Sequence, residues 1–355
     1  MRNLALLALT AGLLVPAGAQ AATKNIVAGP PVSKPPKGVP QDADTNAFYR
    51  KNVTIHVGDK VRWAINGFHT VTFPAKGTKA PPFISPDPTT KISGVNDAAG
   101  APFWFNGQNR LILDPQGAFP VGGKSYDGTK PASAGAPLSE GRPKPYTLKF
   151  TKAGSFGYVC TIHIGMKGTV KVVAKGRAIP SAAADKKAVK AQFAKTVAQA
   201  KRGDKFAGPS GNAVQAGNDT TAVAILRFFP QRKTVPVGTT VTLSMPPTTS
   251  EVHTFSFGPA AYLKQHSDGF IAPDQSKTPP VLVFNPVIAF PSDPPPVLPP
   301  YIGTNHGNGF LSTGVLDRDA ATPSPGSAQI RFDKAGTYDY ICLIHTDMKG
   351  QIVVG

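Results

Sequence analysis

Two short segments of this chain carry the same pattern, and together they contain its only two cysteines. The pattern is C-x-x-H-x-x-M-K-G followed by a run rich in β-branched residues, in YVCTIHIGMKGTVKVV and again in YDYICLIHTDMKGQIVV. Cys160 recurs as Cys342, 182 positions later, and a preceding histidine recurs from FHTVTFP to VHTFSFG. A repeat of this length predicts two units of one fold, each with the pattern in the same place.

The repeated residue types form a coherent metal-ligand set. A thiolate, two imidazoles and a thioether are the ligands of an electron-transfer copper site, with Cys and two His in a plane and a weak axial Met. The sequence therefore predicts two type 1 copper sites, one from His69, Cys160, His163 and Met166, and one from His253, Cys342, His345 and Met348.

Three other interpretations of the pattern were weighed. Cys and Met are also soft fillers of hydrophobic cores, but a plain core gives no reason to repeat two histidines in a chain with only 7 of them. Structural zinc takes Cys and His ligands but not Met. A disulfide between Cys160 and Cys342 would leave two His-Met sets without their thiolate, so copper is favoured.

The amino-terminal 21 residues read as a secretory signal. Arg2 supplies the charge, Leu4 to Pro16 is apolar, and Ala19-Gln20-Ala21 fits a cleavage site. The alternative is a retained anchor, although the apolar stretch is short for a membrane span. We therefore expect an exported protein, either periplasmic or extracellular at the cell surface.

The charge balance is basic, with 38 Lys and Arg against 20 Asp and Glu. For an exported protein this favours an acidic redox partner or the anionic polymers of the cell envelope, by an attraction that weakens with salt. The expected location outside the cytoplasm argues against a nucleic-acid partner. A solvated basic surface without a specific partner is an equally good interpretation.

Composition and periodicity suggest five segments. After the signal, residues 22–43 read as a Pro-rich, extended tether. Residues 44–176 and 218–355 are the expected repeated units, and alternating apolar positions in NVTIHVGDKV and KTVPVGTTVTL predict strands. His56 falls on the polar side of the first of these strands, so we expect a surface residue there.

The segment 177–217 contains an expected helix. Ser181 is a candidate N-cap, Val189, Phe193 and Val197 recur every four residues, and Gly203 is a candidate end. Its narrow apolar stripe predicts a spacer packed on one unit, whereas a membrane-surface helix is the alternative.

Each unit also has a long insertion, rich in Pro and Gly, between its first histidine and its cysteine. His266 and His306 lie in the second insertion, and we expect both to be loop residues without assigned chemistry.

These motifs resemble the cupredoxins, the small blue copper proteins of the plastocyanin and amicyanin type. The resemblance implies an all-β fold, namely two tandem Greek-key β-sandwich domains joined by the helical linker. It implies that one ligand of each site comes from a strand near its first histidine and that the other three lie on the loop between the last two strands. It also implies that an apolar surface patch covers each loop histidine, here beside Ile162 and Ile164 or Leu343 and Ile344.

The leading functional interpretation is an exported electron carrier and not an enzyme. Copper oxidases and nitrite reductases also contain cupredoxin domains, but they need a second kind of copper centre held by additional histidines. This chain has no His-x-His pair, and only His56, His266 and His306 remain unassigned. Copper sequestration or delivery is the third possibility, although such sites usually contain several Met or Cys.

The two loops differ in one charge. Asp347 precedes Met348, where the first loop has Gly165. A negative charge stabilises the more positive Cu(II), so we expect a lower reduction potential at the second centre unless solvent screens the carboxylate.

Overall fold

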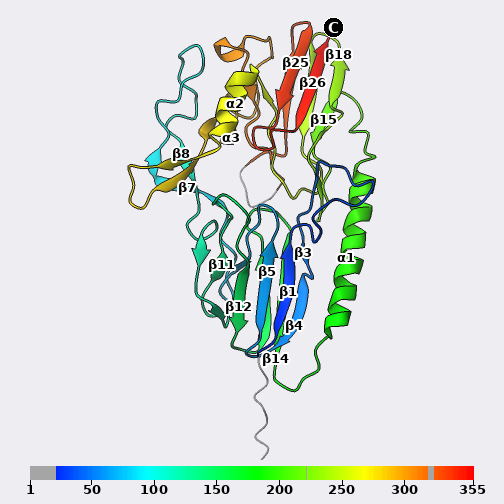
Figure 1. Ribbon diagram of the computed structural model, residues 1–355. Coiled ribbons are helices and arrows are strands. Elements are labelled where there is room, and N and C mark those ends of the chain that lie inside the picture. The colour runs from blue at the N-terminus through cyan, green and yellow to red at the C-terminus, as the bar shows by residue number, and fades with distance from the viewer. Residues whose placement is uncertain (1–20, 221, 319–323) are drawn as a thin grey trace, which may run out of the picture.

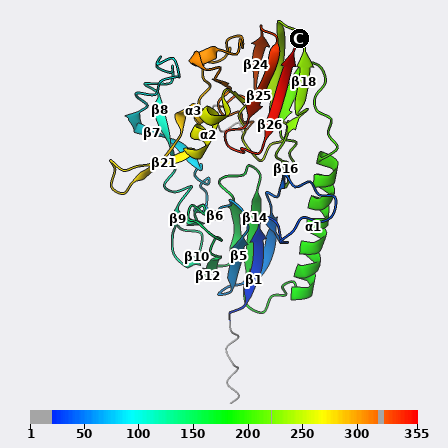
Figure 2. The same cartoon turned by 45° about the horizontal axis from the view of Figure 1, so that its top comes forward.

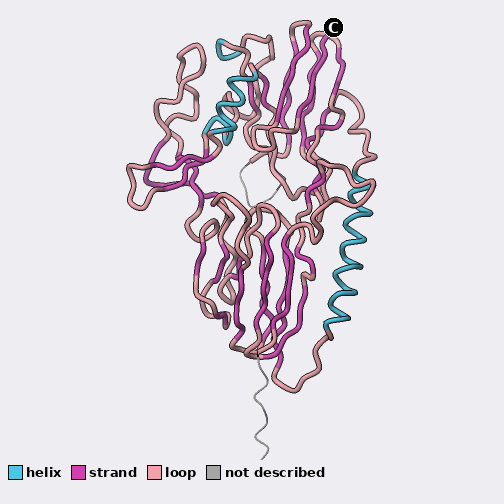
Figure 3. The backbone as a smooth tube through the Cα atoms, in the orientation of Figure 1, coloured by secondary structure: helices cyan, strands magenta, loops and turns pink. Residues whose placement is uncertain are grey.

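The computed structural model describes residues 21–355 apart from residues 221 and 319–323 (Figure 1). The expected signal segment therefore lies, except for Ala21, outside the described residues. Strands dominate the described chain, and they gather into two sandwiches that lie end to end (Figure 3).

The first sandwich has two sheets that enclose one core, in which Trp63, Phe73 and Tyr158 are fully buried. One sheet has the strand order β10 (Ser125–Tyr126), β12 (Tyr146–Phe150), β5 (Lys60–Ile65), β1 (Thr23–Ala28) and β3 (Phe48–Tyr49). The other has the order β4 (Asn52–His56), β14 (Lys167–Val173), β13 (Gly154–Val159), β6 (Thr72–Phe73), β11 (Ala132–Ala134) and β9 (Pro120–Val121).

The second sandwich is built in the same way around Phe228, Phe257 and Tyr340. One sheet has the order β17 (Phe228–Phe229), β15 (Ala213–Ala216), β19 (Thr239–Ser244) and β24 (Ser327–Phe332). The other has the order β18 (Arg232–Val235), β26 (Lys349–Val354), β25 (Gly336–Ile341), β20 (Ser256–Phe257) and β23 (Leu311–Ser312).

Strand directions match between the two sandwiches. β1 runs parallel to β5 as β15 does to β19, and β4 runs parallel to β14 as β18 does to β26. In both halves the strand before the cysteine and the strand after the methionine form an antiparallel pair, β13 with β14 and β25 with β26. The prediction of a mostly β fold made of sandwich units is confirmed.

The expectation of an extended tether over residues 22–43 is wrong for its first part. Residues 23–28 form β1, which is hydrogen-bonded between β5 and β3, and its Ile26 and Ala28 are fully buried. Alternating side chains in TKNIVA give this strand an apolar face. The Pro-rich residues that follow it led us to assign the whole segment to a tether. In the same way, β15 lies inside the segment that we assigned to the linker.

The linker helix is confirmed as α1 (Ala182–Gly203), and the Ser181 hydroxyl accepts a hydrogen bond from the Ala184 backbone N–H. Its packing differs from the expectation, because it contacts both sandwiches (Figure 2). Thr196 accepts a hydrogen bond from the Tyr49 hydroxyl of the first sandwich, at 2.9 Å. Ala200, one turn further on, joins a small core with Ile225 of the second half. The helix therefore braces the two sandwiches together.

The long insertions of the two units fold together into a third body. Its sheet has the order β21 (Ile271–Asp274), β22 (Val281–Phe284), β8 (Asn109–Leu113) and β7 (Ile84–Lys91), so strands from both insertions pair with each other. The same body contains α2 (Ala260–Asp268), α3 (Pro286–Ala289) and the 3₁₀ turn η1 (Asn305–Gly307). His266 lies in α2, so the prediction of a loop position for this residue is wrong.

Further contacts join the two halves. β2 (Ala43–Asp44) pairs with β16 (Ala224–Ile225), and Arg227 binds the Asp42 carboxylate at 2.7 and 2.9 Å. Within the third body, Arg110 of the first insertion lies 2.8 Å from Asp87 and 2.6 Å from Asp274 of the second. These links fix how the two sandwiches face one another. Among the described residues, none of the helices combines the length and the apolar character that crossing a bilayer requires.

We predict that the third body is a packed core and not a pair of loose loops. Phe105 of the first insertion is fully buried and stacks on Phe290 of the second, with ring centroids 5.5 Å apart. Phe105→Ala should lower the free energy of unfolding by about 3–5 kcal/mol, the cost of a truncated buried aromatic. Urea unfolding followed by the fluorescence of the adjacent Trp104 measures this change, in a Trp63→Phe background that removes the other tryptophan.

The exposed Val297 of the same insertion provides the control, since Val297→Ala should change the stability by less than about 0.5 kcal/mol. Equal stability of the two variants would contradict a shared core.

Candidate metal centres

The first candidate centre is assembled from two connections at one end of the first sandwich. His69 lies in the loop between β5 and β6, whereas Cys160 to Met166 form the loop between β13 and β14. Because β6 and β13 are hydrogen-bonded neighbours, these two connections end side by side. The second centre repeats this arrangement, with His253 before β20 and Cys342 to Met348 between β25 and β26.

The donor atoms of the first centre converge. His69 Nδ1 and His163 Nδ1 lie 3.0 Å apart, and the Cys160 sulfur lies 3.4 Å from His163 Nδ1. All three side chains are buried. The structure therefore brings together the three residues that the sequence predicted as its equatorial ligands.

The second centre has the same form and slightly longer distances. His253 Nδ1 and His345 Nδ1 lie 3.1 Å apart, and the Cys342 sulfur lies 3.8 Å from the first and 3.9 Å from the second. Cys342 and His253 are fully buried and His345 is partly exposed.

The two methionines close the loops. The Cys160 N–H donates to the Met166 carbonyl oxygen at 2.9 Å, and the Cys342 N–H to that of Met348 at 3.1 Å. Both methionine side chains are almost completely buried within the core of their sandwich. These hydrogen bonds hold the backbone of each Met next to that of its Cys, and the Met side chain is shielded from solvent. Both features suit an axial ligand.

Sequence reasoning missed a threonine in each centre. The backbone N–H of Thr70 donates to the Cys160 sulfur at 3.4 Å, and that of Thr254 donates to the Cys342 sulfur at the same distance. Hydrogen bonds to a coordinating sulfur tune the redox potential of copper. The sequence did contain a signal for these residues, because Thr directly follows the first histidine in both units, in FHT and in VHT.

Both donor sets fit a metal ion. In each group the ligand atoms lie within 4.8 Å of one another. Such separations suit bonds of about 2.0–2.3 Å from nitrogen and sulfur to one ion between them. A buried thiolate with two imidazoles is a soft set that suits Cu(I), and it also serves zinc. His56, His266 and His306 belong to neither group.

The chemistry of the cysteines agrees with this role. Burial disfavours a thiolate, but contacts with His163 and His69 outweigh it and hold the pKa of Cys160 well below its usual range. In the second centre burial is likewise outweighed by His253 and His345, which lower the pKa of Cys342. Both cysteines are free, so no disulfide competes for their sulfur atoms.

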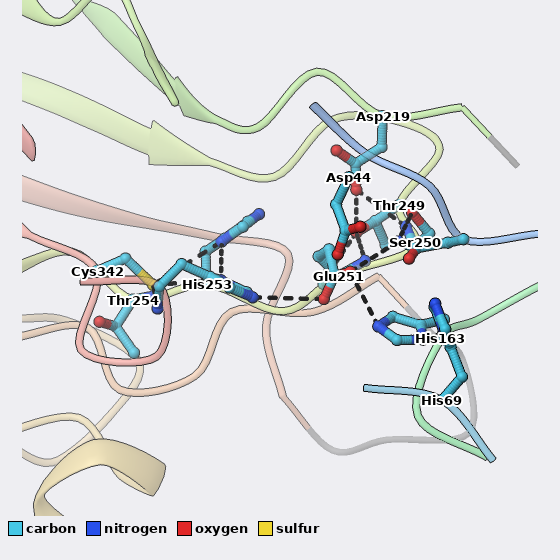
Figure 4. A network of polar contacts seen from close by, with 12 residues as sticks. Asp44, His69, His163, Asp219, Thr249, Ser250, Glu251, His253, Thr254 and Cys342 are labelled. Carbon is cyan, nitrogen blue, oxygen red and sulfur yellow. Dashed lines mark hydrogen bonds and ion pairs between the residues drawn. The ribbon is translucent and has the colours of Figure 1, made fainter. Parts of the chain in front are cut away.

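A buried glutamate lies between the two centres, and we did not predict it. Figure 4 shows Glu251 with His163 on one side and the second centre on the other. Its Oε1 is 3.1 Å from His163 Nε2, and its Oε2 is 3.5 Å from His345 Nε2. The chain has only two glutamates, Glu140 and Glu251. A scarce acid two residues before a candidate ligand was a signal that sequence reasoning could have used.

Glu251 changes the expected surroundings of the loop histidines. The resemblance to cupredoxins implied an apolar surface patch above each of them, but the Nε2 edge of His163 faces this carboxylate and the side chain is 5% exposed. The expectation is therefore wrong for His163. His345 is 22% exposed and is the more accessible of the two.

The upstream histidines also differ in their surroundings. In the second half, a methyl group on Gly217 would lie 3.0 Å from both Asp219 Oδ1 and His253 Nε2, so this carboxylate oxygen lies within about 6 Å of the imidazole nitrogen, without a hydrogen bond between them. Burial raises the pKa of Asp219 to about 6, although His253 opposes the shift. In the first half, the matching space beside His69 adjoins the backbone carbonyl of Asn66. The second centre thus has a buried carboxylate that the first lacks.

Comparisons with known proteins give similarity at the level of solved structures alone. No family model and no curated protein matches the chain. Plastocyanin from Dryopteris crassirhizoma is 17% identical over 40% of this chain and 99% of its own, with a TM-score of 0.20. Auracyanin B is 19% identical over 42% of this chain and 95% of its own, with a TM-score of 0.24.

A Cu(I) methionine variant of amicyanin is 19% identical over 35% of this chain and 70% of its own, with a TM-score of 0.18. All three are cupredoxins, and each covers less than half of this chain. Scores this low carry no functional argument, so the proposals below rest on the geometry of the two centres.

We predict that the thiols of the metal-free protein ionise at unusually low pH. Because their histidines stabilise the thiolate, its ultraviolet absorption should develop well below the usual pKa of about 8.5. Titration of the Cys160→Ser and Cys342→Ser variants reports the two sites separately, and each variant unfolded in urea provides the reference. Inflections at or above the reference value would contradict the contacts described here.

Proposed function

We propose that this protein is an exported electron carrier with two type 1 copper sites. In each site the thiolate and two imidazoles would form the equatorial plane, and Met166 or Met348 would be the axial ligand. Copper supplies the one-electron couple between Cu(I) and Cu(II). The observation that supports this proposal most directly is the double convergence of a buried Cys with two His.

The surroundings of the donors favour electron transfer over turnover. Strands flank the Cys-to-Met loop on both sides, and its backbone is closed by hydrogen bonds, so the ligands would move little between oxidation states. Burial limits access of a substrate to the metal. A nearly fixed arrangement of ligands suits both Cu(I) and Cu(II) moderately well. Because little moves when the electron is transferred, electron exchange stays fast.

The expected partners and location also remain proposals. An exported protein with 18 more basic than acidic residues would attract acidic redox partners or the anionic polymers of the envelope. Such an attraction should weaken as the salt concentration rises.

The test of the proposed function is copper content and colour. The purified protein should bind two copper ions per chain and show an intense thiolate-to-Cu(II) absorption band. Cys160→Ser or Cys342→Ser should each remove about half of the band, and the double variant all of it, since each thiolate serves one ion. A colourless copper-loaded protein, or a preference for zinc, would overturn the proposal.

A second prediction concerns the unequal surroundings of the centres. Asp219→Asn should raise the reduction potential of the second centre, because a buried anion near His253 favours Cu(II). One unit charge on a buried group near a metal ligand corresponds to a shift of the reduction potential on the order of 50–100 mV. The exposed Asp347 should matter less, since solvent screens it.

Redox titration above neutral pH, where Asp219 is ionised, measures both variants, and the first centre of the same molecule is the internal reference. A shift for Asp347→Asn that exceeds the shift for Asp219→Asn would show that the charge in the loop dominates.

A further inference from the structure

Glu251 contacts a candidate ligand of each centre. Each oxygen of its carboxylate faces the Nε2 atom of a different imidazole, His163 at 3.1 Å and His345 at 3.5 Å. The Nδ1 atoms of the same two rings point toward their own cysteine sulfur. One carboxylate therefore connects the two donor sets through two ion-pair contacts, one to each imidazole.

This arrangement fixes the tautomer of both imidazoles. A ring that donates Nε2–H to a carboxylate leaves Nδ1 free to bind a metal, and metal-bound histidines commonly have such a partner. Here a single carboxylate serves two rings from two sandwiches. Burial opposes its charge, but His163 and His345 hold the pKa of Glu251 well below its usual range.

The position of the carboxylate is held from both halves. Asn46 of the first half donates its side-chain N–H to Oε1 at 2.7 Å and also to the Ser250 hydroxyl at 3.2 Å. The Thr249 hydroxyl donates to the backbone carbonyl oxygen of Glu251. Asp219 in turn accepts hydrogen bonds from the Ser250 N–H and the Thr249 hydroxyl, as Figure 4 shows. Glu251 is 7% exposed, so its carboxylate is largely shielded from solvent.

We propose that Glu251 is an internal electron-transfer bridge, through which an electron passes between the two centres along His163, Glu251 and His345. This inference rests on the proposed function, because it requires copper at both sites. The transfer moves one electron, so that one site changes from Cu(I) to Cu(II) and the other from Cu(II) to Cu(I). No covalent bond forms or breaks, and both Nε2 protons stay on their rings.

The bridge is specific to the second repeat. Gly67 occupies the position two residues before His69 that Glu251 occupies before His253. Gly67 has a φ of +100° and lies close to the His69 ring, so this position offers no side chain that could make the reverse connection. Electronic coupling through hydrogen-bonded groups exceeds coupling across an empty gap of equal length. The residue therefore provides a direct route of polar contacts between the two loop histidines.

The test is the redistribution of one electron within the copper-loaded protein. A substoichiometric pulse of a small organic radical reduces one site per molecule, and freeze-quenched electron paramagnetic resonance follows both sites. The spectra of Cys160→Ser and Cys342→Ser, with one centre each, identify the two signals. The unmodified protein should show a first-order phase whose rate is independent of protein concentration.

Glu251→Ala, loaded to two copper ions per chain with excess copper, should lose this phase. Glu251→Gln retains the shape but offers only one acceptor to two N–H donors, so it should slow the phase, and it serves if the alanine variant does not fold. Glu140→Ala removes the only other glutamate, which is exposed, and should leave the rate unchanged.

The outcomes separate the two proposals. A protein without two blue copper centres would overturn both. Two intact centres in Glu251→Ala with an unchanged first-order phase would overturn the bridge alone, as would redistribution that scales with protein concentration. In the diamagnetic Cu(I) protein, nitrogen NMR should find protonated Nε2 atoms on His163 and His345, and deprotonated Nε2 atoms there would also contradict the bridge.

Discussion

The relation between the two centres depends on one buried negative charge. Placing an ionised carboxylate inside a protein is costly unless hydrogen bonds and opposite charge compensate it. Glu251 obtains that compensation from His163 of one sandwich, His345 of the other and the Asn46 amide. Since these groups come from both halves, a shift of one sandwich against the other would leave the charge unpaired. The energy that stabilises the carboxylate thus also aligns the two centres.

The remaining contacts between the halves make that alignment rigid. Strands β8 and β22 belong to different insertions but to one sheet, and Arg110 ties the insertions together from within it. On the other side of the molecule, α1 reaches Tyr49 of the first sandwich and Ile225 of the second half of the chain. Two sandwiches held only by a flexible linker would be expected to move. Braces on two sides make a fixed distance between the centres possible.

The sequence predicted the local parts of this structure well, because ligand residues close together in the chain share one loop. It placed Cys160 with His163, and it recognised α1 from its N-cap Ser181. The failures are non-local. The pairing of β1 in the first sheet, the joint folding of the two insertions and the meeting of Glu251 with His163 all join segments that lie far apart. Periodicity describes the face of an element but not its partner, so these contacts needed the three-dimensional structure.

The two halves differ more in the charges around their candidate centres than in their candidate ligands. Both carboxylates that adjoin candidate ligands, Glu251 and Asp219, come from the second half, whereas the first half has Gly67 and the Asn66 carbonyl at the corresponding places. The carboxylate beside His163 therefore comes from the other half of the molecule, whereas Glu251 and Asp219 belong to the same half as the second centre. A pair of independent carriers would not require this dependence. Under the proposed function, this dependence would let the two centres differ in potential and still exchange electrons with each other.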